Sequence, residues 1–348
     1  MNNRLGRIAS AQTVDFIERP VPPLGRTQVL IRIKASCICG SDLHIFRDRH
    51  PAVRLPVTIG HEFSGVVEAV GSDVSRVRPG DRVTVEPVVA CGKCPACRRG
   101  EYGYCERISF TYREGDGAMA DWFVGEEERV FPLPDSVSFE EGALTEPMAV
   151  ALHAVRRADI RLGDTVVVLG AGAIGILIAA ICRRLGAADI VISDMSGFRL
   201  EMAARLSGAR TVDIRQEDVC QVVKERSGGR GFDKSFECVG REETLHQAID
   251  CVKTNGLVTN VGIYERPQIA FDASLLVKKE LRLQGSQGYC WDFEQAIQLL
   301  QELHPLPMIT HTFALSNLQT AFDTLLDPAS NAIKVCVKPE EEDSNGCA

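Results

Sequence analysis

The sequence predicts an α/β protein of two domains, one rich in β-strands and one with a doubly wound parallel sheet. Across the first ~150 of the 348 residues, short apolar runs are separated by Gly, Pro and Asp turns. From about Leu162 the pattern changes to strand, helix, strand, and a G-x-G-x-x-G segment stands at the first strand-to-helix turn. We place the β-rich domain at residues 1–150, completed by 290–348, and the doubly wound domain at 151–289.

The β-rich domain is expected to hold short strands bounded by turns such as Pro79-Gly80-Asp81. The strands predicted there are Val29–Ala35, Phe63–Val70, Arg82–Val85 and Trp122–Val124.

The second domain opens with Thr165–Leu169, a continuous apolar run typical of a buried parallel strand. Ala173–Leu185 has the length of a helix, and Gly186 follows where a glycine commonly ends one. Asp189–Ser193 and Gly256–Val261 are predicted as further strands. The chain returns to the first domain through an amphipathic helix, Phe293–Leu303, and a strand, Ala332–Val337. We expect the acidic end, Glu340–Ala348, to be frayed.

Composition indicates a soluble globular protein, with 45% hydrophobic and 25% charged residues. The longest apolar run, Ile174–Cys182, is far shorter than the roughly 20 residues that cross a bilayer. A net charge of -8 argues against nucleic-acid or anionic-membrane partners. No secretion signal is recognisable, so the thirteen cysteines indicate a reducing compartment. We therefore expect a cytoplasmic protein with neither nucleic acid nor membrane as a partner.

Four cysteines follow the spacing C-x2-C-x2-C-x7-C on a loop rich in glycine and proline; they are Cys91, Cys94, Cys97 and Cys105. Such a loop lets four thiolates converge on one zinc ion in tetrahedral geometry. The alternative is four ordinary free cysteines, which prefer apolar surroundings, whereas this loop carries Lys93, Arg98 and Arg99. Because protein ligands fill all four positions, a zinc ion there has a structural role.

A second set of candidate zinc ligands leaves one coordination position unfilled by protein. Cys39, His61 and Glu62 offer one thiolate, one imidazole and one carboxylate, and three protein ligands leave a position for water or an alcohol. Glu146 adds a carboxylate that binds directly or through that water. Each residue has an ordinary alternative: a core cysteine, a histidine bonded to a turn, a carboxylate at a strand edge, and a glutamate that favours the helix after Pro147. No spacing rule ties Cys39 to His61.

The glycine-rich segment is Gly170-Ala171-Gly172-Ala173-Ile174-Gly175, between a predicted strand and a predicted helix. In this context it indicates a dinucleotide site rather than a ligand-free turn. The first glycine makes the tight turn, the second lets the pyrophosphate approach, and Gly175 lets helix and strand pack closely. The phosphates are expected at the helix N-terminus, beside Ala173 and Ile174.

The choice of dinucleotide is expected to depend on Asp194, which lies 19 residues after Gly175 at the end of the next strand. A carboxylate there accepts the ribose hydroxyls and repels a 2′-phosphate, so NAD is favoured over NADP. Arg199 is expected to stack on the adenine or to tolerate a phosphate. Val239, Val261 and Ser286 complete the expected cofactor-binding set.

Together these residues resemble the zinc-containing medium-chain dehydrogenases, within them the sorbitol-dehydrogenase-like branch. The resemblance covers nearly the whole chain. Its motifs are Cys39-Gly40-Ser41-Asp42-Leu43-His44, Gly60-His61-Glu62, Gly80-Asp81-Arg82-Val83, the cysteine quartet, Glu141-Gly142-Ala143-Leu144-Thr145-Glu146-Pro147, the glycine-rich segment and Phe236-Glu237-Cys238-Val239-Gly240.

The family implies a GroES-like catalytic domain built from both chain ends, a Rossmann domain between them, and a catalytic zinc on Cys39, His61 and Glu62. The polyol branch carries glutamate where Glu146 stands. Two positions depart from sorbitol dehydrogenases: Ile45 replaces a tyrosine, and Gly288 replaces an arginine. Both positions line the substrate pocket in that family, so the resemblance implies the chemistry and leaves the substrate open.

The predicted reaction is hydride transfer between a secondary alcohol and NAD, with zinc acting as a Lewis acid toward the hydroxyl. Ser41 is expected to take the alcohol proton and pass it through the cofactor ribose to His44. Their alternatives are a helix N-cap for Ser41 and a solvated surface histidine for His44.

Other substrates for the same catalytic residues are a sugar acid, a cyclitol, a diol or threonine. The alternative class of protein is a nucleotide-binding protein without turnover. The family also implies a homo-oligomer, a tetramer or a dimer.

Overall fold

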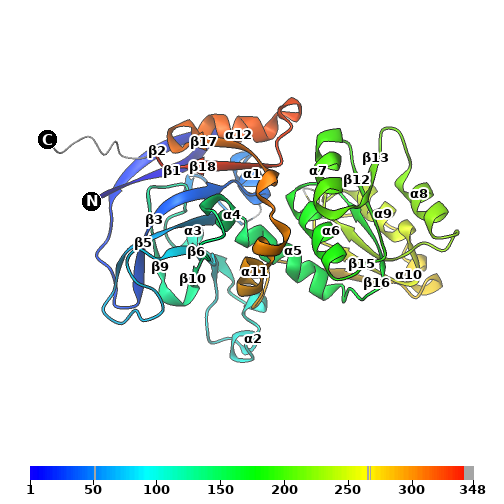
Figure 1. Cartoon of the computed structure of the whole chain (residues 1–348), viewed down its shortest axis with the longest axis horizontal. Helices are drawn as coiled ribbons and strands as arrows, with labels where there is room; N and C mark the ends of the chain where they lie inside the picture. Colours follow the sequence, from blue (N-terminus) through cyan, green and yellow to red (C-terminus); the bar gives the residue numbers. More distant parts are fainter. Residues whose placement is uncertain (51, 265, 267, 341–348) are drawn as a thin grey trace. The chain divides into compact units, whose positions relative to one another are not determined.

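The computed structural model describes residues 1–50, 52–264, 266 and 268–340. The chain divides into two compact units, one formed by Met1–Glu146 with Phe293–Ala348 and the other by Pro147–Asp292 (Figure 1). The first boundary lies inside helix α5 (Thr145–Arg157), and the second lies directly before helix α11 (Phe293–Leu303). The unit that both chain ends form is called the terminal unit below, and Pro147–Asp292 the central unit.

The described part of the terminal unit is built on a seven-stranded sheet with the order β10-β6-β5-β3-β18-β17, in which β9 also pairs with β3. These strands are β3 (Gln28–Cys37), β5 (Glu62–Val70), β6 (Arg82–Val85), β9 (Trp122–Glu126), β10 (Val130–Pro132), β17 (Ile309–Ala314) and β18 (Lys334–Lys338). Two small sheets accompany it, one of β1 (Asn2–Ser10), β2 (Thr13–Pro20) and β4 (Val57–Thr58), and one of β7 (Val88–Val89) and β8 (Ser109–Phe110).

Short helices accompany the strands of the terminal unit. They are α1 (Gly40–Phe46), α2 (Pro95–Arg98), α3 (Thr111–Glu114), α4 (Phe139–Ala143), α11 and α12 (Leu318–Leu326). One of them, α2, lies in the loop of the cysteine quartet (Figure 1). Helix α12 packs its apolar face onto α1, where the rings of Phe46 and Phe322 stack with centroids 4.6 Å apart. This core joins the two ends of the chain, because α1 lies early in the sequence and α12 lies late.

The central unit contains a six-stranded parallel sheet with the order β13-β12-β11-β14-β15-β16. Its strands are β11 (Thr165–Leu169), β12 (Asp189–Asp194), β13 (Arg210–Asp213), β14 (Phe232–Glu237), β15 (Val252–Asn260) and β16 (Arg282–Gly285). Its helices, besides most of α5, are α6 (Ala173–Arg184), α7 (Gly197–Ser207), α8 (Val219–Arg226), α9 (Glu242–Cys251) and α10 (Ser274–Lys278). The strand order reverses between β11 and β14, and such a switch point is where doubly wound sheets bind ligands.

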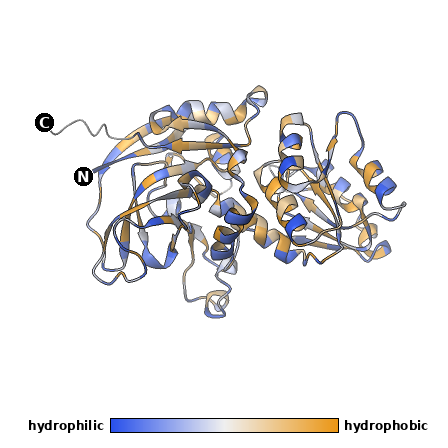
Figure 2. Ribbon diagram, in the orientation of Figure 1, coloured by the Kyte–Doolittle hydropathy of each residue, from blue (hydrophilic) through white to orange (hydrophobic). Residues whose placement is uncertain are grey.

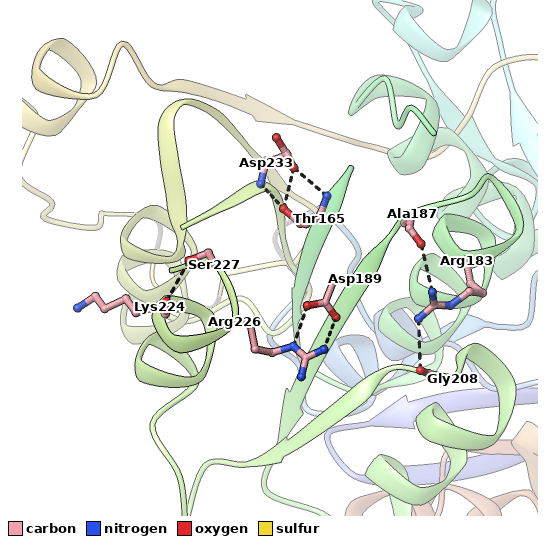
Figure 3. Close-up of polar contacts among 9 residues, drawn as sticks. All are labelled: Thr165, Arg183, Ala187, Asp189, Gly208, Lys224, Arg226, Ser227 and Asp233. Carbon is pink, nitrogen blue, oxygen red and sulfur yellow. Dashed lines mark hydrogen bonds and ion pairs between the residues drawn. The ribbon is translucent and has the colours of Figure 1, made fainter. Parts of the chain in front are cut away.

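The parallel sheet is apolar at its centre and polar at its strand ends. Figure 2 shows hydrophobic colour along the central strands, in agreement with full burial of Val166, Val167 and Val168. Side-chain contacts connect the amino ends of these strands to the rest of the unit (Figure 3). Asp233 accepts hydrogen bonds from the backbone N–H and hydroxyl of Thr165, and Asp189 pairs with Arg226. The opposite, carboxyl edge of the sheet carries the glycine-rich segment.

The structure confirms the α/β fold class and the doubly wound sheet. Helix α11 has the predicted bounds, and α6 ends one residue before the predicted end, with Gly186 at φ +89° beyond it. The final strand starts at Lys334, two residues later than expected. Glu340 was wrongly placed in a frayed tail, because it pairs with Arg4 and accepts the N–H of Ser316; the rest of that tail lies outside the described residues. No described helix has the length and apolarity needed to span a membrane.

Candidate active site and metal centres

The antiparallel pairing of β3 with β5 brings the open ligand set together. In its register Cys37 pairs with Glu62, so Cys39, just beyond the end of β3, lies beside His61, the residue directly before β5. Gly60 permits the turn before His61: its φ is +100°, and a Cβ there would lie 2.5 Å from the backbone nitrogen of Met119. The structure thereby supplies the link between Cys39 and His61 that no sequence spacing provides.

One ligand atom from each of Cys39, His61 and Glu62 lies within 4.8 Å of the others. Glu62 is 1% exposed and His61 3%, while Cys39 is partly exposed. A buried mixture of sulfur, nitrogen and oxygen donors at this separation suits one zinc ion. Glu146, in the first turn of α5, is buried nearby but does not belong to the group within that distance.

His61 lies between the carboxylate of Asp42 and two aromatic rings. Its Nδ1 is 3.5 Å from Oδ1 of Asp42, and neither buried atom has a hydrogen-bond partner among the described residues. Burial opposes the imidazolium, but the charges of Asp42 and Cys39 outweigh it and raise the pKa of His61. The rings of Phe110 and Tyr112 lie 5.9 Å and 5.5 Å from the imidazole. A carboxylate beside a ligating imidazole commonly orients it toward a metal ion.

Glu62 is held by a buried lysine from the far end of the chain. Nζ of Lys334, on β18, donates to Oε1 of Glu62 at 2.6 Å, also contacts Oε2, and donates to the carbonyl of Ile38 at 3.1 Å. Lys334 is 4% exposed, and although burial opposes its charge, the charge of Glu62 raises its pKa. Lys334 therefore neutralises the carboxylate and fixes its direction.

We expect Lys334→Gln to lower the free energy of unfolding of the metal-free protein by about 3–5 kcal/mol, since it leaves the Glu62 charge buried without its cation. Bound zinc supplies a replacement cation, so the loss should be smaller in the zinc-loaded protein. Urea unfolding of both forms measures this difference. Lys338→Gln, on the same strand but partly exposed in an ion pair with Glu140, is the matched control and should change stability by less than about 1 kcal/mol. Equal losses for the two variants would contradict this account of Lys334.

Two further groups near the cluster favour their neutral forms. Burial, and then the neighbouring charge of Glu62, raise the pKa of Glu146 to about 7. Burial raises the pKa of Tyr112 to about 12. Both groups therefore present a protonated oxygen to their surroundings more readily than an exposed carboxyl or phenol does.

The structure places Ser41 and His44 on α1, immediately after Cys39. The helix N-cap is Cys39 itself, so the alternative of Ser41 as the N-cap is wrong. His44 lies in the last turn, partly buried. Ile45, where the resemblance implies a substrate-pocket position, is 1% exposed and packs in the core around Phe46.

The cysteine quartet converges as its spacing predicts. The Sγ atoms of Cys91, Cys94, Cys97 and Cys105 lie within 4.8 Å of one another, in a loop that turns through Gly92 and Gly100 at positive φ. Backbone N–H groups point at the sulfurs, as the N–H of Cys91 does toward Cys105 at 3.2 Å. N–H groups of Lys93 and Cys94 lower the pKa of Cys91 to about 6, which favours the thiolate. Four sulfur donors and no other ligand type fit a structural zinc ion.

The glycine-rich turn has the shape that a dinucleotide phosphate requires. Gly170 has φ +100°, and a Cβ on Gly175 would lie 1.9 Å from the carbonyl oxygen of Gly170. Gly172, the N-cap of α6, faces open space, because a Cβ there would meet nothing within 4 Å. Ala173 and Ile174 form the first turn of α6. An anion can approach the free N–H groups at this helix end directly.

The other candidate cofactor residues lie at or just beyond the carboxyl ends of neighbouring strands, except Arg199, which lies on a helix. Asp194 ends β12, and its Oδ2 accepts the N–H of Ala171 at 2.8 Å. Arg199 lies in the first turn of α7. Val239, Val261 and Ser286 follow β14, β15 and β16, and the buried hydroxyl of Ser286 has no hydrogen-bond partner among the described residues.

Sequence reasoning did not single out Glu237, which connects two of these loops. Its Oε1 accepts the N–H groups of Val239 and Gly240, both at 2.8 Å, and its carbonyl accepts those of Val261 and Gly262. The side chain is fully buried. The available signal was its position as the last residue of a strand, directly before the loop that holds Val239 and Gly240.

Two family models match the chain. An alcohol dehydrogenase GroES-like domain matches residues 25–135, and a zinc-binding dehydrogenase domain matches residues 173–302. The sorbitol dehydrogenase of Bacillus subtilis (strain 168) is 32% identical over 92% of this chain and 92% of its own length. This chain belongs to the zinc-binding alcohol dehydrogenases.

Solved structures agree with the assignment of this chain to that family. The 2R,3R-butanediol dehydrogenase from Bacillus subtilis has a TM-score of 0.87 and 32% identity, over 97% of this chain and 100% of that chain. A Sinorhizobium meliloti 1021 protein described as a zinc-binding dehydrogenase and bound to NADP has a TM-score of 0.88 and 29% identity, over 97% and 100%. The predicted family, the GroES-like and Rossmann fold, and zinc-dependent oxidation of alcohol or polyol CH–OH groups are thereby confirmed.

Proposed function

We propose that this dehydrogenase transfers a hydride between NAD and the secondary alcohol of a polyol, a sugar acid or a diol. The observation that carries the proposal is the buried set of Cys39, His61 and Glu62, whose three donors leave a coordination position open. Relatives that share the fold are a sorbitol dehydrogenase and a 2R,3R-butanediol dehydrogenase, and both names describe substrates with adjacent hydroxyl-bearing carbons.

In the proposed site each residue has a separate role. Cys39, His61 and Glu62 would hold the catalytic zinc ion, Asp42 would orient His61, and Lys334 pairs with Glu62. Glu146, whose pKa is raised to about 7, does not belong to the group of ligand atoms within 4.8 Å of one another. It would therefore act through a water molecule. A zinc ion bound there would supply Lewis-acid polarisation of the substrate hydroxyl. The thiolate of Cys39 and the carboxylate of Glu62 would offset part of the zinc charge, which would favour release of the ketone product.

Proton transfer is assigned to Ser41 and His44, which share helix α1 with the ligand Cys39 at its N-cap. Ser41→Ala should lower kcat by about 10²–10³ and change the pH dependence of kcat, since a general acid–base group contributes on this scale. Steady-state kinetics across pH measure both effects. Ser36→Ala, a buried serine on β3, is the control and should leave the pH profile as it is. An unchanged rate and profile in Ser41→Ala would remove the relay from the mechanism.

NAD is proposed as the cofactor because Asp194 places a carboxylate at the end of β12, directly beside the turn at Ala171. We expect Asp194→Asn, which keeps a hydrogen-bond acceptor, to raise the KM for NAD about tenfold and to increase kcat/KM for NADP about tenfold. The control is Asp213→Asn, because Asp213 lies opposite Asp194 on the neighbouring strand β13. A similar structure binds NADP, so the wild-type enzyme must be measured with both cofactors. A wild-type preference for NADP would overturn this assignment.

A substrate panel tests the proposal as a whole. The zinc-loaded enzyme is mixed with NAD and with polyols, sugar acids, cyclitols, diols or threonine, and NADH absorbance is followed. Reduction of NAD by polyols or diols supports the proposed class, and turnover of threonine alone contradicts it. Absence of turnover with every compound, in a protein that binds two zinc ions and NAD, would favour the alternative of a non-catalytic nucleotide-binding protein.

Exposed apolar residues support a proposal about assembly, and the cysteines support one about location. We propose a homo-oligomer, a dimer or a tetramer, because the edge strand β16 and its surroundings expose Leu283 (38%) and Val277 (80%). Sedimentation of the enzyme as a monomer at assay concentration would contradict this. A cytoplasmic location is proposed because the described cysteines are not joined in disulfides.

A further inference from the structure

Two cysteines outside both metal centres lie in sulfur-to-sulfur contact in the central unit. Cys220 is the second residue of α8, and Cys251 is the last residue of α9. Their Sγ atoms are 3.3 Å apart, with the thiol of Cys251 donating to Cys220. A disulfide has an S–S length of about 2.05 Å, so an approach of roughly 1 Å brings the pair to bonding distance.

The two thiols differ in access and in acidity. Cys251 is 1% exposed and belongs to the apolar core of the unit, whereas Cys220 is partly exposed at the edge of that core. The hydrogen bond from Cys251 lowers the pKa of Cys220, although burial opposes it, and the same contact raises the pKa of Cys251. Cys220 also lies in the first turn of α8, where the helix dipole favours a thiolate.

Two other described thiols of the central unit, Cys182 and Cys238, lack this combination. Cys182 is fully buried, and burial raises its pKa far above the ordinary value. Cys238 likewise has a pKa raised by burial. Neither has a second sulfur within hydrogen-bonding distance among the interactions described for these residues. The pair of Cys220 and Cys251 therefore unites an accessible nucleophile with a partner thiol already in contact.

We propose that Cys220 and Cys251 form a peroxide-reactive pair, in which Cys220 is oxidised first and Cys251 closes an intramolecular disulfide between α8 and α9. This site is separate from the zinc and dinucleotide chemistry, and it requires no change in either.

The reaction balances with hydrogen peroxide as the oxidant. The thiolate sulfur of Cys220 attacks one peroxide oxygen, the O–O bond breaks, and a sulfenic acid forms as hydroxide leaves. The sulfur of Cys251 then attacks the sulfenic sulfur, the S–O bond breaks, and the S–S bond forms as the oxygen leaves as water. In total, two thiols and one hydrogen peroxide give one disulfide and two water molecules, and a dithiol reductant reverses the step.

Tryptic peptides make the product easy to identify. Cleavage after Lys and Arg releases residues 216–224 and 242–253, and each of these peptides contains one cysteine. The zinc-loaded full-length protein is treated with limiting hydrogen peroxide, its remaining thiols are alkylated in denaturant, and the unreduced digest is analysed by mass spectrometry. We expect a 216–224/242–253 cross-link as the first oxidation product, and its loss after dithiothreitol. Cys182, in residues 162–183, should remain alkylated as an internal control.

Two variants test the order of events. In Cys251→Ser, dimedone should trap a sulfenic acid at Cys220. In Cys220→Ser, Cys251 should remain alkylated under the same peroxide dose. Retained NADH binding shows that each variant is folded. The proposal is overturned if the thiols of the quartet oxidise before any cross-link forms, or if Cys251 in Cys220→Ser oxidises as fast as Cys220 does in the wild type.

Discussion

Cys39→Ser should abolish alcohol oxidation and remove one of two zinc ions from each chain. Cys39 supplies the only sulfur of the ligand set with His61 and Glu62, and a serine hydroxyl is a poor substitute for a thiolate on zinc. Metal polarisation of the hydroxyl contributes several kcal/mol to the transition state, and each 1.36 kcal/mol is a factor of ten in rate. We therefore expect kcat/KM to fall by at least about 1,000-fold.

The measurement combines steady-state kinetics with zinc analysis of the purified variant. The thermal midpoint should change little, because Cys39 lies outside the apolar clusters that stabilise the terminal unit. Cys182→Ala, a buried thiol of the central unit, is the control and should retain both zinc ions and full turnover. If Cys39→Ser keeps two zinc ions or turns over at more than a tenth of the wild-type rate, the open site is not the catalytic centre.

Cys94→Ser should have the opposite profile, a large loss of stability with turnover retained at low temperature. The small apolar cluster around this loop consists largely of the four cysteines themselves, with Ala90, Ala96 and Ile108. Without zinc, little else holds the loop together, and the remaining thiolates repel one another. We expect a loss of at least about 3 kcal/mol, which lowers the Tm of a unit of this size by roughly 6–12 °C.

Differential scanning calorimetry and zinc analysis measure this effect. The zinc content should fall from two ions to one, and kcat at 10 °C should stay within about tenfold of the wild type. Lys93→Ala, in the same loop but without a ligand, is the control. An unchanged thermal midpoint in Cys94→Ser would mean that the quartet does not stabilise the fold through a metal ion.

The sequence carried enough information for the architecture because the deciding patterns are local. Alternating strands and helices predict the parallel sheet, and Gly170, Gly172 and Gly175 mark its first turn. The quartet was equally visible, since its ligands lie within fifteen consecutive residues, from Cys91 to Cys105. Such features depend on neighbours along the chain, and their geometry follows from spacing alone.

The open site required the tertiary structure, because its parts meet only through strand pairing. The register of β3 with β5 joins Cys39 to His61, and that of β18 with β3 brings Lys334 from the end of the chain to Glu62. Lys334 had a sequence signal that was not used, since apolar residues flank this lysine on both sides, Ala332-Ile333 before it and Val335-Cys336-Val337 after it. No sequence signal indicated that Asp42 and Tyr112 lie beside His61, because their positions depend on how α1 and α3 pack against the sheet.

Stepwise return of zinc to the metal-free enzyme tests the central claim most directly. The quartet, with four sulfur ligands, should fill first, so the first equivalent of zinc should restore thermal stability with little turnover. Alcohol-dependent reduction of NAD should then rise between one and two equivalents and level off at two. Full turnover at one equivalent, or in protein without zinc, would contradict the assignment of catalysis to the site of Cys39, His61 and Glu62.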